Sequence, residues 1–365
     1  MVAVLWIVVG AILTHTKLYN HDECDMTYSH RRFYPVAVPG DESPYQLYKF
    51  TDRRDPRHAK LWGSNGPTDW CLNSGTNETV IPVLFIPGHG GDYQQGRSLG
   101  AHALGLTGAQ YLDRPSIQRI LQQTQGLMDV YAVDFNEEAT ALHGAYFVRQ
   151  TNFVRKAIQQ LVEVCGYESL AIVAHSMGGL VARVAAADLD DKVHAIVTLA
   201  TPHERPILTW ETTALQYHLQ SRMLAPSERV VISIAGGLRD ELIPPETCQL
   251  PDDPHFLSFL ATSVMEMPKD EGKISPALGM DHKAIAWCHN ILAPVRQILL
   301  SLHETRSKQS GERVDIIRRL LKLPDDMSVA NSVQEEDDAF LVRWAHHFAL
   351  VACISSFRSY IFLWA

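Results

Sequence analysis

Five short apolar runs, each followed by a glycine or polar turn, set the pattern of hydrophobic positions along this chain. Each run has the length and the β-branched content of a strand that is buried on both faces. The runs are Val80–Pro87, Met128–Asp134, Leu170–Ala174, Val193–Ala200 and Val230–Ala235. The pattern therefore predicts the interior strands of one sheet.

Stretches with helical spacing lie between these runs. In Asn152–Cys165 the apolar residues recur at intervals of three and four, which gives a helix one face to pack on a sheet. Arg97–Leu112 and Lys283–Leu300 also have helical patterns, the first interrupted by glycines. Strands that alternate with helices form right-handed βαβ crossovers, so we expect an α/β fold with a mostly parallel central sheet and helices on both faces.

Three further segments depart from this alternation. Asn20–Asn73 is polar and aromatic-rich, and we expect it to be an irregular lead-in that packs across the domain. Pro202–Arg229 is amphipathic, and Leu242–Pro276 is rich in proline and acidic residues. Each of these two insertions is either a lid over a site or a segment packed on the domain's own core.

The two ends of the chain differ from its middle. Met1–Leu13 is almost continuously apolar and has no positive leading region or small-residue cleavage site, which favours an uncleaved signal anchor over a cleaved signal peptide. Phe348–Ala365 is apolar but split by Arg358, so it makes a poor membrane span. We expect a signal anchor or signal peptide at 1–19, a catalytic domain at 20–302 and a charged extension with an apolar end at 303–365.

The candidate nucleophile is Ser176, at the point where the third apolar run stops. The run ends in A-H-S-M-G-G, and an alanine-rich helical pattern follows. This is the nucleophile elbow of α/β-hydrolases, usually G-x-S-x-G, with Ala174 in place of the first glycine. Small residues are needed there because the turn is strained and crowded. The elbow narrows the fold prediction to an α/β-hydrolase with lid-like insertions.

A serine esterase also needs a base and a carboxylate that orients the base, in the chain order Ser, acid, His. Asp240 follows Val230–Ala235 through Gly-Gly-Leu-Arg, and His282 lies in the loop before the last helical pattern. Parallel strands bring such loops to one edge of the sheet, where we expect both residues to meet Ser176. Position alone leaves other candidates open: His203, His255 and His289 for the base, and Glu241, Glu246, Asp252 and Asp281 for the acid. His175 is interpreted as elbow packing.

The oxyanion that forms on an attacked ester needs backbone N–H donors. Met177, at the start of the helix behind the elbow, supplies the first. The glycine-rich turn at residues 87–91, P-G-H-G-G, follows the first strand run, where α/β-hydrolases place the second donor. We therefore expect the second N–H to come from His89 or Gly90.

Composition and charge limit the partners. The net charge of −9 argues against a nucleic-acid-binding surface, which needs clustered Lys and Arg. The six cysteines have no C-x-x-C pair or zinc-like spacing, and neither a metal nor an organic cofactor is implied. Cys165 lies on an apolar helical face, whereas Cys24, Cys71 and Cys248 are candidates for a disulfide. Asn77 begins a glycosylation sequon, which agrees with a lumenal domain.

A series of short segments occurs in one order along the chain. They are the glycine-rich turn with Arg97-Ser98, Phe135-Asn136-Glu137-Glu138, the elbow, Ala200-Thr201-Pro202-His203, Gly236-Gly237-Leu238-Arg239-Asp240 and Asp281-His282-Lys283-Ala284-Ile285-Ala286-Trp287-Cys288. Together they resemble the GPI inositol-deacylase family of lipase-like α/β-hydrolases, over roughly residues 24–300. Many lipases share the elbow, whereas the F-N-E-E, G-G-L-R-D and D-H-K-A-I-A-W-C segments are much more specific.

The resemblance implies a function. Members of that family are membrane proteins of the endoplasmic reticulum that hydrolyse the fatty-acyl ester on the inositol of GPI anchors, which assists export of GPI-anchored proteins. They typically continue through a further lumenal region and several transmembrane helices. For this chain the resemblance implies a lumenal catalytic domain that acts at a membrane surface on GPI lipid or GPI-anchored proteins, with Ser176, Asp240 and His282 as the catalytic residues. A general lipase or carboxylesterase, and an inactive fold that binds GPI or cargo, are the alternatives.

Overall fold

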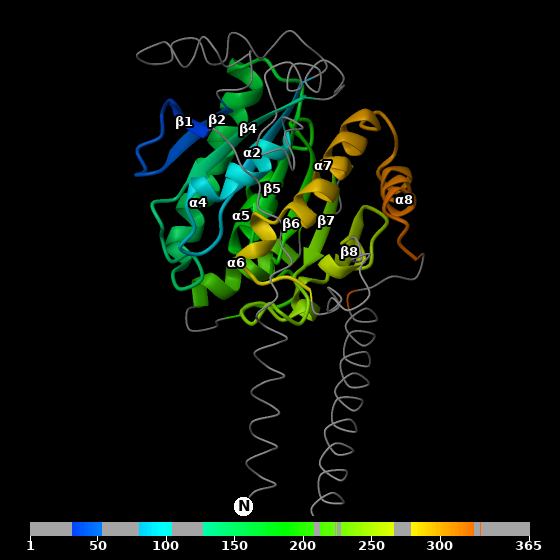
Figure 1. Cartoon of the computed structure of the whole chain (residues 1–365). Coiled ribbons are helices and arrows are strands. Elements are labelled where there is room, and N and C mark those ends of the chain that lie inside the picture. Colours follow the sequence, from blue (N-terminus) through cyan, green and yellow to red (C-terminus); the bar gives the residue numbers. More distant parts are fainter. Residues whose placement is uncertain are drawn as a thin grey trace, which may run out of the picture.

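A single mixed sheet of eight strands forms the centre of the described structure (Figure 1). The computed structural model describes residues 31–52, 80–103, 127–207, 212–222, 224, 228–265, 279–324 and 329. The strands are β1 Arg31–Val36, β2 Gln46–Asp52, β3 Val80–Ile86, β4 Leu127–Asp134, β5 Leu170–His175, β6 Val193–Leu199, β7 Val230–Ala235 and β8 Phe256–Leu260. Their order across the sheet is β1-β2-β4-β3-β5-β6-β7-β8.

The five predicted strand runs are confirmed as β3 to β7. All neighbours from β4 to β8 pair in parallel, whereas β2 runs antiparallel to both β1 and β4. The expectation that Asn20–Asn73 is irregular was wrong for its described part, because β1 and β2 lie within it. Likewise, the insertion Leu242–Pro276 contributes β8 to the sheet.

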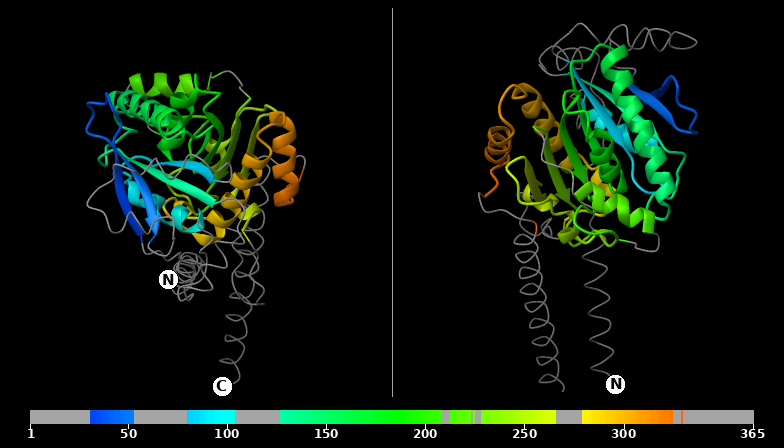
Figure 2. Two further views of the ribbon diagram at one scale, coloured as in Figure 1. Left: turned by 90° about the horizontal axis from the view of Figure 1, so that it is seen from above. Right: turned by 180° about the vertical axis from the view of Figure 1, so that it is seen from behind.

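Helices cover both faces of the sheet, as predicted. On one face lie α4 Gly144–Gln159, α5 Met177–Ala186 and α6 Thr212–Arg222 (Figure 2). On the other lie α2 Arg97–Ala103 and α7 His289–Glu304, with α8 Ser310–Leu321 beside α7 and in contact with β7. Helix α4 begins eight residues before the predicted Asn152 and ends in a π-helical turn, Gln160–Val164. The sheet is therefore the middle of three layers.

Each interior strand supplies both apolar layers at once. In β3, Val83 and Phe85 face the layer under α2 and α7, whereas Leu84 and Ile86 face the layer under α4 and α5. Successive side chains of a strand point to opposite faces, so a continuous apolar run fills two cores. Complete burial of each large side chain contributes about 1.5–3 kcal/mol.

The packed core extends beyond residue 302. Val314 and Ile317 of α8 are buried in the same cluster as α7, because they lie three residues apart on one face of the helix. Arg313 of the same helix is buried too, and it donates to the carbonyls of His194 at 3.0 Å and Leu302 at 3.2 Å. Among the described residues, no helix combines the length and the apolar character needed to cross a membrane.

Several predictions concern residues outside the described ranges. The apolar segment Met1–Leu13, the sequon at Asn77 and the end Phe348–Ala365 are among them. The described parts of the two insertions pack on the domain. Tyr217 of α6 lies against Phe147 of α4, with ring centroids 5.0 Å apart.

Candidate active site

Ser176 occupies a strained turn between β5 and α5. Its backbone has φ 54° and ψ −131°, a conformation that non-glycine residues adopt only when the surroundings enforce it. Two hydrogen bonds hold it there. The Ser176 N–H donates to the carbonyl of Leu199 at 2.8 Å, and the Thr201 hydroxyl donates to the carbonyl of Ser176 at 2.8 Å. The strand-turn-helix geometry of a nucleophile elbow is therefore present.

Glycines around the turn allow the backbone segments to approach each other. A Cβ at Gly88 would lie 2.6 Å from the Cβ of Ser176, and one at Gly178 would overlap the carbonyl oxygens of Ile86 and Pro87. A Cβ at Gly179 would overlap the side chain of Thr201. The requirement for small residues at the elbow is thus steric, and α5 starts directly against the end of β3.

Asp240 and His282 come together from separate loops. Asp240 follows β7 and its Oδ1 accepts the N–H groups of Leu242 at 3.1 Å and Ile243 at 2.9 Å. Its Oδ2 lies 2.9 Å from Nδ1 of His282. The Asp240 side chain is fully buried and that of His282 is 9% exposed, so the pair is shielded from water. Such a carboxylate fixes the orientation of the ring and leaves Nε2 as the reactive nitrogen.

The loop that carries His282 is fastened to the elbow as well as to Asp240. His175, next to Ser176, donates its Nε2–H to the carbonyl of His282 at 2.7 Å, and the two rings lie 4.7 Å apart. Burial, followed by the nearby His282, lowers the pKa of His175 to about 3, so the ring is neutral. His175 therefore holds the His282 segment beside the elbow, which is a structural role of the kind that the sequence indicates.

The two candidate donors in the glycine-rich turn after β3 differ in whether their N–H groups already have an acceptor. The Gly90 N–H donates to the carbonyl of Glu138 at 3.0 Å, which removes it as an oxyanion donor and corrects that expectation. Within the described residues, the N–H groups of His89 and Met177 donate no hydrogen bond. These two remain as candidates for the oxyanion hole.

Comparisons with known proteins identify the relatives of this chain. A family model described as "PGAP1-like alpha/beta domain" matches residues 77–302, which include Ser176, Asp240 and His282. The chain belongs to this family. A mouse protein named GPI inositol-deacylase is 30% identical over 248 residues, which cover 64% of this chain and 25% of the mouse protein. The protein of the same name from Aspergillus oryzae is 27% identical over 316 residues, which cover 76% of this chain and 26% of that protein.

This PGAP1-like chain spans about a quarter of the length of those relatives. Among solved structures, Aspergillus fumigatus lipase B matches with a TM-score of 0.43 and 13% identity, over 75% of this chain and 66% of the lipase. An arylesterase matches with a TM-score of 0.44 and 11% identity, over 81% of this chain and 96% of that protein.

In this PGAP1-like domain, the other candidate bases have other partners. His203 is buried between Thr198, at 2.8 Å, and Arg183, at 3.3 Å. His289 stacks on His102 with ring centroids 5.0 Å apart. His255 lies 3.4 Å from Asp253. None of these three has a recorded contact with Asp240 or the elbow in the described part of the chain.

The other candidate acids point elsewhere too. Asp281 precedes His282, yet its carboxylate accepts the N–H groups of Lys283 at 2.9 Å and Ala284 at 3.1 Å. Glu246 pairs with Arg205 at the surface, 3.0 Å away. Glu241 and Asp252 are exposed.

The cysteines correct one expectation. Cys248, a candidate for a disulfide, is free and fully buried, and burial raises the pKa of its thiol. Cys165, expected only as core, is buried and disulfide-bonded, and Cys288 is disulfide-bonded as well. Helical spacing identified Cys165 as buried but carries no information about its bonding.

Two residues that hold backbone near Ser176 had no role assigned to them from the sequence. Thr201 holds the carbonyl of Ser176, and Glu138 holds the Gly90 N–H. Both lie in segments that carried the family resemblance. Another sequence signal for each is its place just beyond a predicted strand, where side chains of this fold gather.

Proposed function

We propose that this chain is a serine esterase that hydrolyses the fatty-acyl ester on the inositol of GPI anchors. The observation that carries the proposal is the His282–Asp240 hydrogen bond of 2.9 Å, in a segment that His175 ties to the strained Ser176. Family membership over residues 77–302 and relatives named GPI inositol-deacylase support the substrate class.

The reaction proceeds through an acyl-enzyme. The Ser176 Oγ attacks the carbonyl carbon of the ester while Nε2 of His282 takes the hydroxyl proton, and Asp240 stabilises the resulting imidazolium. The N–H groups of Met177 and His89 donate to the oxyanion. Collapse breaks the bond to the inositol oxygen, which receives the proton from His282. A water, deprotonated by His282, then attacks the acyl carbon. The bond to Ser176 Oγ breaks, Oγ takes the proton back from His282, and the fatty acid leaves.

The proposal also implies where the domain works in the cell. The acyl chain of a GPI anchor lies in a bilayer, so the domain works at a membrane surface. Disulfide-bonded Cys165 and Cys288 support an oxidising compartment, which fits the lumen of the endoplasmic reticulum. GPI-anchored proteins are then the substrates.

The decisive experiment compares the wild type with Ser176→Ala on inositol-acylated GPI in microsomes. We expect the variant to fold and to lose deacylation by about 10³-fold or more, since the nucleophile is absent. A fluorophosphonate probe labels the wild type and not the variant. Fatty-acid release by the variant at the wild-type rate would refute the mechanism, and activity on simple glycerides without activity on acylated GPI would favour a general lipase.

A further inference from the structure

The loop after β4 is bonded to the turn that carries the proposed oxyanion donor. The carbonyl of Glu138 accepts the Gly90 N–H at 3.0 Å, and the Ala141 N–H donates to Nδ1 of His89 at 3.1 Å. Desolvation lowers the pKa of His89. The Ala141 contact assigns Nδ1 as the acceptor nitrogen of its ring. Two adjacent residues of the turn are thus held by one neighbouring loop.

That neighbouring loop has a strained backbone. Asn136 and Glu137 have φ values of 56° and 53°, in the left-handed region that non-glycine residues rarely adopt. Asp134 supports the turn by accepting the Asn136 N–H at 2.9 Å. Among the described non-glycine residues, the other positive φ values next to strands are at Ser176 and Ala200. Strain of this kind persists only where the surroundings over-determine the conformation, and it gathers at functional sites.

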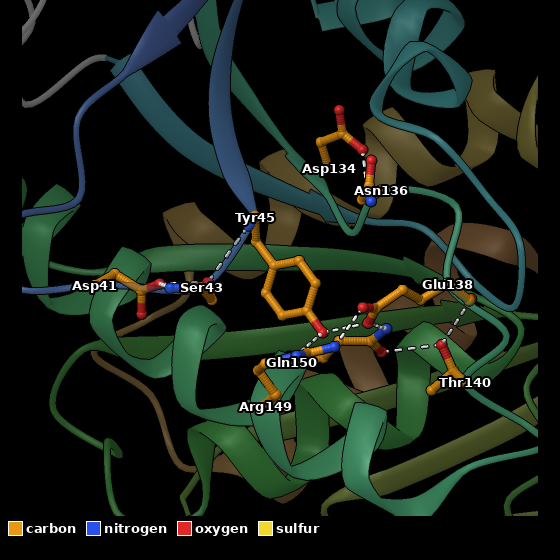
Figure 3. Close-up of polar contacts among 9 residues, drawn as sticks. All are labelled: Asp41, Ser43, Tyr45, Asp134, Asn136, Glu138, Thr140, Arg149 and Gln150. Carbon is orange, nitrogen blue, oxygen red and sulfur yellow. Dashed lines mark hydrogen bonds and ion pairs between the residues drawn. The ribbon is translucent and has the colours of Figure 1, made fainter.

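The side chain of Glu138 supplies that constraint (Figure 3). Its carboxylate accepts hydrogen bonds from the Tyr45 hydroxyl and from a terminal nitrogen of Arg149. Arg149 also donates its Nε–H to the Tyr45 oxygen at 2.9 Å, which closes a three-membered ring of contacts. Tyr45 directly precedes β2, and Arg149 lies on α4, so the carboxylate joins its own loop to two other parts of the fold.

The contacts of the Glu138 carboxylate with Tyr45 and Arg149 are called the anchor below. A second set of contacts extends it. Gln150 lies beside Arg149 on α4, and its amide oxygen accepts the Thr140 hydroxyl at 2.9 Å. The Thr140 N–H in turn donates to the carbonyl of Glu138 at 3.0 Å, the same oxygen that receives the Gly90 N–H. Glu138 thus uses its side chain to fix its own position and its carbonyl to hold the turn at Gly90.

The Tyr45 phenol stays a hydrogen-bond donor in this set of contacts. Burial, followed by the hydrogen bond to Glu138, raises the pKa of Tyr45, so the phenol keeps its proton and continues to donate. The Glu138 side chain is 13% exposed, whereas that of Arg149 is 43% exposed. The half-exposed cation contributes little stability by itself, and the shielded carboxylate serves to fix the position of its own main chain.

We propose that Glu138 is a positioning residue that sets the oxyanion hole through the Gly90 amide, with Tyr45 and Arg149 as its supports. The inference rests on the proposed esterase function. The bond from Gly90 to Glu138 fixes the plane of the turn, and this directs the adjacent His89 N–H toward the ester oxygen. Loss of the anchor lets the turn rotate, so the donor is misaligned when charge develops on the oxygen.

The test compares Glu138→Ala and Glu138→Gln with the wild type on a p-nitrophenyl ester and on inositol-acylated GPI. We expect Glu138→Ala to lower kcat by about 10- to 100-fold with KM within about 3-fold, because the donor acts mainly in the transition state. Glu138→Gln keeps an acceptor for Tyr45 and recovers part of the loss. The midpoint of the pH–rate profile stays unchanged, because neither variant touches His282 or Asp240.

The matched control is Glu168→Ala, which removes an exposed carboxylate paired with Arg306 at 2.9 Å, just before β5. Its kcat should stay within about 2-fold of the wild type. Unchanged kcat in Glu138→Ala, or a loss fully matched by a lower folded fraction, overturns the positioning role while the esterase proposal stands. A wild type that neither hydrolyses the esters nor reacts with a fluorophosphonate overturns both.

Discussion

Asp240 and Asp281 both lie within reach of the His282 loop, yet only Asp240 contacts the ring. Asp281 is the neighbour in sequence, and its carboxylate turns back to accept two backbone N–H groups of the following turn. Asp240 is 42 residues away and contacts Nδ1 because its loop packs on the His282 loop. A Cβ at Gly279 would overlap the Gly236 carbonyl, so glycine is needed for that approach.

The two aspartates give a matched test at the residue scale. Asp240→Asn should lower kcat by about 10³- to 10⁴-fold, because an amide favours the wrong tautomer of His282. Asp281→Asn should keep kcat within about 3-fold, since its contacts are local to a turn. Steady-state kinetics on an ester substrate, with circular dichroism to verify folding, measures both. Equal losses in the two variants would remove the assignment of Asp240 as the orienting carboxylate.

At the scale of elements, the sequence predicted the strands whose apolar character is continuous and missed those that carry polar residues. Strand β2 contains Lys49, which is 4% exposed and pairs with Asp129 of β4 at 3.0 Å. A buried lysine in a strand needs a charged partner, and here that partner is 80 residues away in the sequence, on the neighbouring strand. Strand β8 is short and sits in a stretch rich in proline and acidic residues. No local sequence pattern predicts β2 or β8.

The residues of the candidate site also fall into those that local sequence predicts and those that it does not. Ser176 was predictable because the elbow is local, a strand, a tight turn and a helix in sequence. The roles of Gly90 and Glu138 were not, because the bond between them joins loops that follow different strands. Sequence placed both loops at the same edge of the sheet, and only the fold determines which amide is already engaged.

The packing of α5 on the strand edge gives a prediction at this scale. Gly179→Ala should destabilise the fold by about 1–3 kcal/mol, because its Cβ overlaps the buried Thr201. Thr201→Ala should cost about 1 kcal/mol through loss of the hydrogen bond to Ser176. Combined, the two changes should destabilise by less than the sum, since the smaller side chain makes room for the new methyl group. Urea unfolding of the four proteins measures this coupling, and strict additivity would contradict the steric argument.

Considered as a whole, the molecule keeps several buried histidines neutral. Burial is the main cause that lowers the pKa to about 3 for His102 on α2, His175 beside Ser176 and His194 on β6. Around His194 lie His303, Arg306 and Arg313, which add to the shift, and the Ser169 hydroxyl, 3.0 Å from its Nδ1. The unfolded chain protonates these rings near pH 6.5, whereas the native chain does not.

The free energy of unfolding should therefore fall as the pH drops below about 6.5, and go on falling until the native rings protonate near pH 3. Stability from this source is complete above pH 6.5, because both states then hold neutral rings. Within the window each ring contributes a slope of about 1.4 kcal/mol per pH unit. His194→Gln removes one such ring, so its unfolding free energy should change less between pH 6 and pH 5, by about 1 kcal/mol. Urea unfolding of the wild type and the variant at both pH values measures the difference. An identical slope in the two proteins would mean that His194 already binds its proton in the native state, and burial would then not keep this ring neutral.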